Sequence, residues 1–143
     1  MLLNFLMNLY SATELKILAI AGIVGAAISR AIGGFDMQIE MLMMFVVVDY
    51  TTGMYAGWKT KQLSSQIGFR GILKKATIFI VVAFFYAADL MFNTNTLRYM
   101  AICGYGVLEL VSIIENADRG GWGSLFPYFV RDKLVQIKTE RKL

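Results

Sequence analysis

Three acidic residues lie in or beside strongly apolar stretches of the chain, where a carboxylate has chemical consequences. Asp49 follows MLMMFVVV, Asp89 follows IFIVVAFFYAA, and Glu109 interrupts CGYGVLELVSII. A charged side chain at the centre of a membrane helix costs about 2.5–3.5 kcal/mol on insertion scales, so such groups pair, face water or relay protons. We therefore expect helices that hide these groups from lipid, in a polar-cored membrane assembly.

The residue types that support most enzyme and metal sites are scarce. The chain has no histidine and a single cysteine, and it lacks the G-x-x-x-x-G-K-[ST] phosphate-binding sequence. Histidine-based catalysis, a catalytic triad and a zinc site would each lack their usual parts. We expect a protein that is not an enzyme and needs no metal or cofactor.

Hydrophobic residues make up 57% of the 143 residues, above the roughly 45–50% of soluble domains. We predict four short transmembrane helices, near the lower length limit for crossing about 30 Å of hydrocarbon. They cover residues 15–32, 39–57, 76–92 and 97–114. The first is the weakest, because its uncharged run is short. The predicted fold is an all-α integral membrane domain over residues 1–118, followed by a basic tail over residues 119–143.

The connectors differ in charge, and this predicts the topology. Residues 58–75 form a long basic connector, and residues 93–96 (NTNT) form a tight polar turn near Asp89, which we expect to be an interfacial acid. The basic connector and the basic tail are separated by two spans and so share a side, which the positive-inside rule makes cytoplasmic. We expect both termini in the cytoplasm of a bacterium whose cytoplasmic membrane holds the protein.

The tail has the pattern of an amphipathic helix that begins near Pro127. Phe126, Phe129, Val130, Leu134 and Ile137 recur at helical spacing. The cations proposed to contact the membrane surface are Lys74 and Lys75 at the start of the third span, and Arg131, Lys133 and Lys138 in the tail. With a net charge of +4, the chain suits anionic lipid better than nucleic acid, because the cations cluster between apolar segments.

Small residues recur four positions apart on two of the predicted helices, which permits close helix packing in lipid. The residues expected to support packing or oligomerisation are Ala21, Gly25, Ser29 and Gly33 on the first helix, and Asp49, Thr52, Gly53 and Gly57 on the second. The spacing does not say whether the packing is within one chain or between chains.

Polar residues on the fourth span extend the set of intramembrane groups that began with Asp49. Glu109, Ser112 and Asn116 share one helical face, and Glu115 lies beside them. We expect these side chains to face other helices or a lumen, with Glu115 and Asn116 near the solvated boundary. Asp49 can be neutral, paired or hydrated, and Arg70, Lys74 or Lys75 can reach the depth of Glu109.

Together these segments resemble the phage lysis and toxin-secretion holin family, which includes holin-like proteins of clostridial toxin loci. The similarity covers roughly residues 44–134. It is carried by DYTTGMYAGWKTKQLSSQIGFRGILKK, with its Asp49, Thr52 and Gly53, by ELVSIIEN, and by Pro127 before an amphipathic helix. The basic part of the first run contributes Ser64, Ser65, Gly68, Gly71, Lys74 and Lys75.

The resemblance implies a protein that oligomerises in the bacterial membrane into a lesion, through which an endolysin or a large toxin passes as cargo. Its partners would be lipids and other copies of itself. Two alternatives stay open. One is a small four-helix proton-coupled transporter, although Glu14 precedes the first span rather than lying within it. The other is an accessory membrane subunit that docks through its basic tail.

Overall fold

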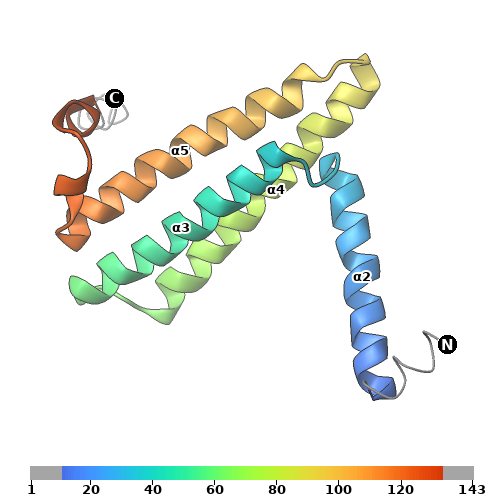
Figure 1. Ribbon diagram of the computed structural model, residues 1–143, viewed down its shortest axis with the longest axis horizontal. Coiled ribbons are helices and arrows are strands. Elements are labelled where there is room, and N and C mark those ends of the chain that lie inside the picture. The colour runs from blue at the N-terminus through green and yellow to red at the C-terminus, as the bar shows by residue number, and fades with distance from the viewer. Residues whose placement is uncertain (1–10, 134–143) are drawn as a thin grey trace.

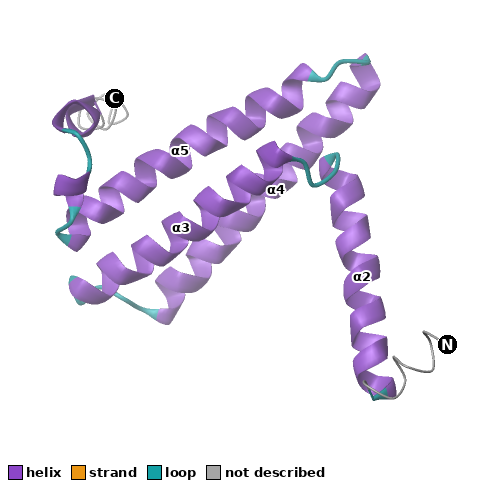
Figure 2. Ribbon diagram, in the orientation of Figure 1, coloured by secondary structure: helices purple, strands orange, loops and turns teal. Residues whose placement is uncertain are grey.

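The computed structural model describes residues 11–133, and these are almost entirely helical (Figures 1 and 2). The long helices are α2 (Ala12–Ile32), α3 (Met37–Lys59), α4 (Ser65–Phe92) and α5 (Thr96–Gly120). The short 3-10 turn η1 (Gly123–Leu125) follows, and the chain is helical again over residues 128–133, directly after Pro127. All four long helices are long and apolar enough to cross a membrane, so the predicted fold class is confirmed.

Local capping explains where these helices begin and end. Ser11 and Glu14 form a capping box at α2, and the Asp36 carboxylate accepts a 3.0 Å hydrogen bond from the N–H of Ile39 at the start of α3. Both motifs satisfy backbone donors that a helix N-terminus leaves unpaired. Helices α2 and α4 end at Gly33 and Asn93, each in the left-handed conformation.

The basic segment over residues 58–75, expected to connect two spans, is mostly helical in the structure. Helix α4 begins at Ser65, because the Ser64 hydroxyl accepts a 3.3 Å hydrogen bond from the N–H of Ile67, and only residues 60–64 link α3 to α4. Charge kept residues 65–75 out of the predicted span, but charge does not prevent a helix whose one face is polar. Arg70, Lys74 and Lys75 therefore lie on a helix.

Helices α3, α4 and α5 run side by side as a bundle in which α4 is antiparallel to the other two, and α3 packs most extensively on α5 (Figure 1). The apolar core contains Ile39, Leu42 and Val46 of α3, Ile78 and Val82 of α4, Ile102 of α5 and Ile32 of α2. We call the end of the bundle with the turns at residues 33–36 and 93–95 the Arg98 end. The opposite part, built from residues 49–59, 65–75 and 109–120, is the Lys75 half.

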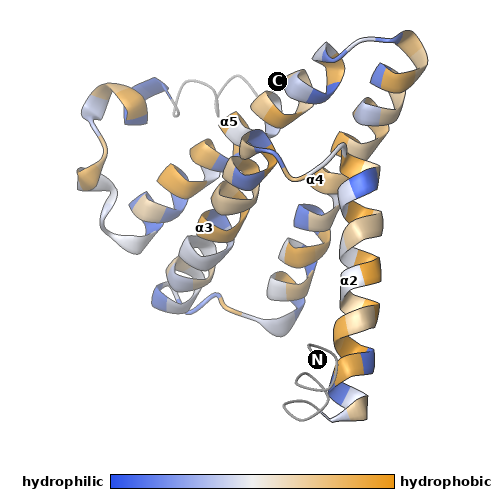
Figure 3. Ribbon diagram, turned by 45° about the vertical axis from the view of Figure 1, so that its right-hand side comes forward, coloured by the Kyte–Doolittle hydropathy of each residue, from blue (hydrophilic) through white to orange (hydrophobic). Residues whose placement is uncertain are grey.

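Helix α2 contacts the bundle at the Arg98 end and then diverges from it (Figure 1). Only 6% of its membrane-span window is buried, against 28% for α3 and α5. Its surface is rich in exposed isoleucine and valine, as the hydropathy colouring shows (Figure 3). In a membrane, this apolar surface must contact lipid or another protein, because its exposure to water is unfavourable.

Candidate functional site: an ion cluster inside the helix bundle

One lysine joins the three helices of the bundle through two carboxylates. The ammonium of Lys75 on α4 donates to Asp49 Oδ2 on α3 and to Glu109 Oε2 on α5. Asp49 and Glu109 are buried, and the Lys75 side chain is 13% exposed. Buried charges are tolerated when they are paired and hydrogen-bonded, so the two acids within the spans are held by one shared cation.

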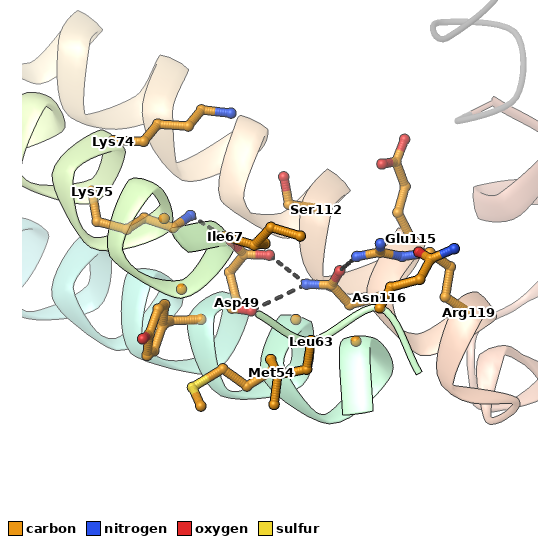
Figure 4. Close-up of a pocket in the computed structure, with 16 residues that line it drawn as sticks. Asp49, Met54, Leu63, Ile67, Lys74, Lys75, Ser112, Glu115, Asn116 and Arg119 are labelled. Atoms are coloured by element: carbon orange, nitrogen blue, oxygen red, sulfur yellow. Dashed lines mark hydrogen bonds and ion pairs between the residues drawn. The ribbon is translucent and has the colours of Figure 1, made fainter. Parts of the chain in front are cut away.

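Asn116 completes the cluster on the side of Asp49. Its Nδ2 donates to Asp49 Oδ1 at 2.8 Å, to the Asp49 carbonyl at 3.1 Å and to Thr52 Oγ1 at 3.2 Å. Its Oδ1 accepts from the Arg119 guanidinium (Figure 4). The sequence placed Asn116 near a solvated boundary, but the structure buries it, because its amide satisfies groups on α3 that would otherwise lack partners.

Two cavities flank the cluster. One, of about 320 Å³, lies between α3, α4 and the end of α5, and Asp49, Lys75 and Asn116 are among its lining residues (Figure 4). The other, of about 440 Å³, lies between α4 and α5, and Glu109 lines it. Ser112 and the partly buried Glu115 line both cavities. In the Lys75 half, cavities thus border α4 on the sides that face α3 and α5.

Two adjacent lysines take different positions. Lys74 is exposed and extends away from Asp49, whereas Lys75 points into the bundle (Figure 4). The expectation that Lys75 contacts the membrane surface is therefore corrected. The sequence contains a signal for the inward position of Lys75. One face of α4 carries residues at helical spacing, namely Lys75, Ile78, Val82 and Asp89.

A second set of polar contacts lies at the Arg98 end, and the sequence analysis missed it. Arg98 is buried; its Nε donates to the Ile32 carbonyl at 2.6 Å, its Nη1 to Asp36 Oδ2 at 2.6 Å and its Nη2 to the Gly34 carbonyl at 3.3 Å. The hydrogen bond from this guanidinium is the largest cause that lowers the pKa of Asp36. Arg98 thus ties the end of α2 and the start of α3 to α5.

Asp89, expected to be an interfacial acid, lies beside the turn at residues 93–95, but its side chain is buried within the protein. Asp89 is only 3% exposed, and its carboxylate accepts hydrogen bonds from the N–H groups of Leu97 at 3.1 Å and Arg98 at 2.8 Å, and from the Thr94 hydroxyl. These are the unpaired donors at the start of α5. Asp89 therefore fixes the turn between α4 and α5 from inside.

Comparison with known proteins decides the family. The bacteriophage holin family matches residues 26–139. The chain belongs to this family. The match begins within α2 and includes the whole ion cluster and the Arg98 contacts.

Individual relatives agree with this assignment. A probable holin of Bacillus phage phi105 is 27% identical over 103 residues, covering 71% of this chain and 75% of the relative. An uncharacterized Listeria innocua protein is 41% identical over 98 residues, covering 68% and 70%, and an uncharacterized Clostridium perfringens protein is 31% identical over 122 residues, covering 84% and 89%. No solved structure matches the chain.

The small residues of this holin-family protein fall into two groups. A side chain added at Gly25 would meet nothing within 4 Å, and Ala21 is exposed, so the middle of the α2 stripe is open. Gly33, at the end of the same stripe, has φ +84°, and an added Cβ would lie 2.7 Å from the Tyr86 ring. Gly33 is therefore needed for packing within the chain, whereas Gly25 is free to contact something else.

The glycines of α3 pack inside the bundle. An added Cβ at Gly53 would lie 3.2 Å from Asn116 Nδ2, and one at Gly57 would lie 3.6 Å from Leu63. Gly53 therefore permits the close approach of α5 that brings Asn116 to Asp49 and Thr52. This part of the predicted packing set acts within one chain in the structure.

The basic tail is described only in part. The Arg131 guanidinium contacts the Asp118 carboxylate at 2.7 Å, and Lys133 is exposed. Leu125, Tyr128 and Phe129 leave most of their apolar surface exposed next to these cations. Lys138, Leu134 and Ile137, which the sequence analysis placed on the same helix, lie outside the described residues.

Proposed function

We propose that this protein acts as a holin: it accumulates in the cytoplasmic membrane of a bacterium and oligomerises into lesions without catalysing a reaction. The lesions let an endolysin reach the cell wall or let a large toxin leave the cell. The observation that carries the proposal is the holin-family match over residues 26–139, on a chain with four helices able to cross a membrane.

The distribution of apolar surface supports self-assembly. Helix α2 has most of its surface unburied, and small residues on one face let helices approach closely in lipid. We propose that the face with Ala21, Gly25 and Ser29 contacts another copy, and that Gly33, Thr52, Gly53 and Gly57 shape each chain for assembly.

The face can be tested with one substitution and a matched control. Gly25→Leu fills the open space at the stripe, whereas Ala27→Leu adds a similar bulk on the opposite side of α2. We expect chemical cross-linking in membranes to show a loss of oligomers for Gly25→Leu and wild-type oligomers for Ala27→Leu. Equal cross-linking of both variants would show that this face of α2 does not mediate oligomerisation.

The proposed topology places the Lys75 half and both termini in or toward the cytoplasm, because the basic residues gather there. There Lys74, Arg131, Lys133 and Lys138 would contact anionic lipid head groups, with Leu125 and Phe129 inserted at the interface. Cysteine accessibility from outside intact cells tests this, since a cysteine placed at Asn95 should react and one placed at Lys61 should not.

The lesion itself is tested by expressing the protein in a bacterium that contains a cytoplasmic endolysin without an export signal. Abrupt lysis that needs both proteins is expected, because a folded enzyme crosses only a large opening. Continued growth, with the protein shown to be in the membrane, would contradict the proposal.

The ion cluster supports one alternative, a small proton-coupled transporter. Intramembrane carboxylates beside cavities, as found at Asp49 and Glu109, are used in proton relays. Uptake of a small substrate that is coupled to protons and abolished by Asp49→Asn would favour transport. Release that does not depend on solute size would favour the holin.

A further inference from the structure

We propose that the Lys75 half of α4 is the part of the bundle that opens, and that the excess negative charge of the ion cluster sets how readily it opens. This inference rests on the proposed lesion-forming function for its purpose, but its physical basis is a property of the single chain. It concerns how Asp49, Lys75 and Glu109 hold α4 against α3 and α5.

Packing is unevenly distributed along α4. Ile78 and Val82 pack in the apolar core, and Asp89 is bonded to the start of α5. Before Ile78 the helix meets cavities on two sides, of about 320 Å³ and 440 Å³. Lys75 lines the first of them and reaches the other two helices, so its ion pairs tie this half of α4 to both α3 and α5.

The ion pairs of Lys75 also leave one negative charge unbalanced. One ammonium serves two buried carboxylates, so the three side chains carry a formal charge of −1. Asp49 is also bonded to Asn116, while Glu109 is held by Lys75. Lys74, Glu115 and Arg119 also line the first cavity, where any water present would screen their charges more than the buried ones.

Charges buried in a region of low dielectric are costly unless they are compensated. An ordinary ion pair is weakened by the loss of either partner. A cluster with one surplus carboxylate responds differently: losing that carboxylate leaves a balanced pair, whereas losing the lysine leaves two uncompensated acids. The structure therefore predicts opposite signs for two substitutions in one network.

The test compares Glu109→Gln with Lys75→Gln. The amide introduced by Glu109→Gln keeps a carbonyl oxygen that accepts from Lys75, and it removes the surplus charge. We expect Glu109→Gln to raise the thermal unfolding midpoint of the purified protein in detergent and to delay lysis. We expect Lys75→Gln to lower the midpoint and to advance lysis.

Two matched controls separate the cluster from net charge. Lys61→Gln changes an exposed lysine in the link between α3 and α4, and Glu40→Gln removes an exposed acid near the start of α3. Both should keep the wild-type midpoint and lysis time. If Lys75→Gln does not fold, a comparison of the unfolding midpoints of Glu109→Gln and Glu40→Gln still shows whether loss of the Glu109 charge raises or lowers the midpoint.

A midpoint for Glu109→Gln that is unchanged or lower than wild type would overturn the proposal, because the cluster would then be an ordinary stabilising network. The thermal unfolding midpoint is measured on the purified protein in detergent, so it does not depend on lesion formation. If the midpoints follow the expected signs and the wild type causes no lysis, the proposed function fails while the charge relationship stands.

Discussion

The two ends of the bundle hold their helices together in different ways. At the Arg98 end, Arg98 is bonded to two backbone carbonyls and to Asp36, and Asp89 accepts from the first N–H groups of α5. These contacts join polar groups within short turns, next to the apolar core. In the Lys75 half, a single lysine beside a cavity pairs with carboxylates on two other helices.

The contacts at the Arg98 end are fixed by the local fold, whereas those in the Lys75 half can change. Contacts to the backbone at helix ends depend on the local fold and cannot be exchanged without unfolding a turn. Ion pairs between the sides of helices can separate while each helix keeps its own hydrogen bonds. We therefore expect substitutions at the Arg98 end to change folding, and substitutions in the Lys75 half to change opening.

The largest effect is expected for Arg98→Gln. The buried guanidinium satisfies Asp36 and the carbonyls of Ile32 and Gly34, and its loss should destabilise the protein by about 3 kcal/mol or more. Thermal unfolding in detergent measures this. Arg30→Gln, which removes an exposed arginine in the last turn of α2, should change the stability by less than about 0.5 kcal/mol. Equal effects of the two changes would contradict the assignment of Arg98 as the tie.

A smaller effect is expected for Asp89→Asn. The carboxylate accepts two backbone N–H groups of α5, and the amide keeps one acceptor oxygen, so the cost should be about 1–2 kcal/mol, as for the loss of a helix cap. Asp118→Asn is the control, because Asp118 is exposed and contacts Arg131 at the surface. Hydrogen exchange should show faster exchange at the start of α5 in Asp89→Asn alone.

The smallest effect concerns pH at the Arg98 end. Arg98 lowers the pKa of Asp36 in the folded state, so the contact adds stability above the ordinary carboxyl pKa of about 3.9. That contribution should be lost as the pH falls through the lowered value. Unfolding midpoints measured from pH 6 to pH 3 should fall less steeply for Asp36→Asn than for the wild type. Parallel curves would show that the contact adds nothing.

The sequence predicted the helical fold because apolar runs are long and turn residues are clear. It also predicted that Asp49 could pair with a cation, and that Lys75 was among the cations within reach of Glu109. It did not single out Lys75, because the span was expected to begin at residue 76 and Lys75 was counted with the basic connector before it. Extending α4 back to Ser65 puts Lys75 in register with Ile78 and Val82.

The burial of Arg98 and Asp89 was not predicted, for a related physical reason. Charged residues at the ends of apolar spans usually face the membrane boundary, and composition alone cannot distinguish these from charges that bond a neighbouring turn. The spacing could have suggested it, since Arg98 lies four residues before the buried Ile102. The bond from Arg98 to the Ile32 carbonyl joins residues far apart in the chain, and no local pattern predicts it.

The most direct test of the account asks whether α4 must leave α3 for a lesion to form. In a Cys103→Ser background, Tyr50→Cys and Gly71→Cys place thiols on α3 and α4 beside the first cavity, where an added Cβ at Gly71 lies 3.5 Å from the Tyr50 ring. Phe45→Cys with Gly106→Cys links α3 to α5 instead, since an added Cβ at Gly106 lies 3.8 Å from Phe45. Both pairs are joined by a short reducible linker in vesicles loaded with fluorescent dextran.

We expect the α3–α4 link to retain the dextran until the linker is reduced, and the α3–α5 link not to prevent its release. Full release of dextran while α3 and α4 remain linked would contradict this expectation.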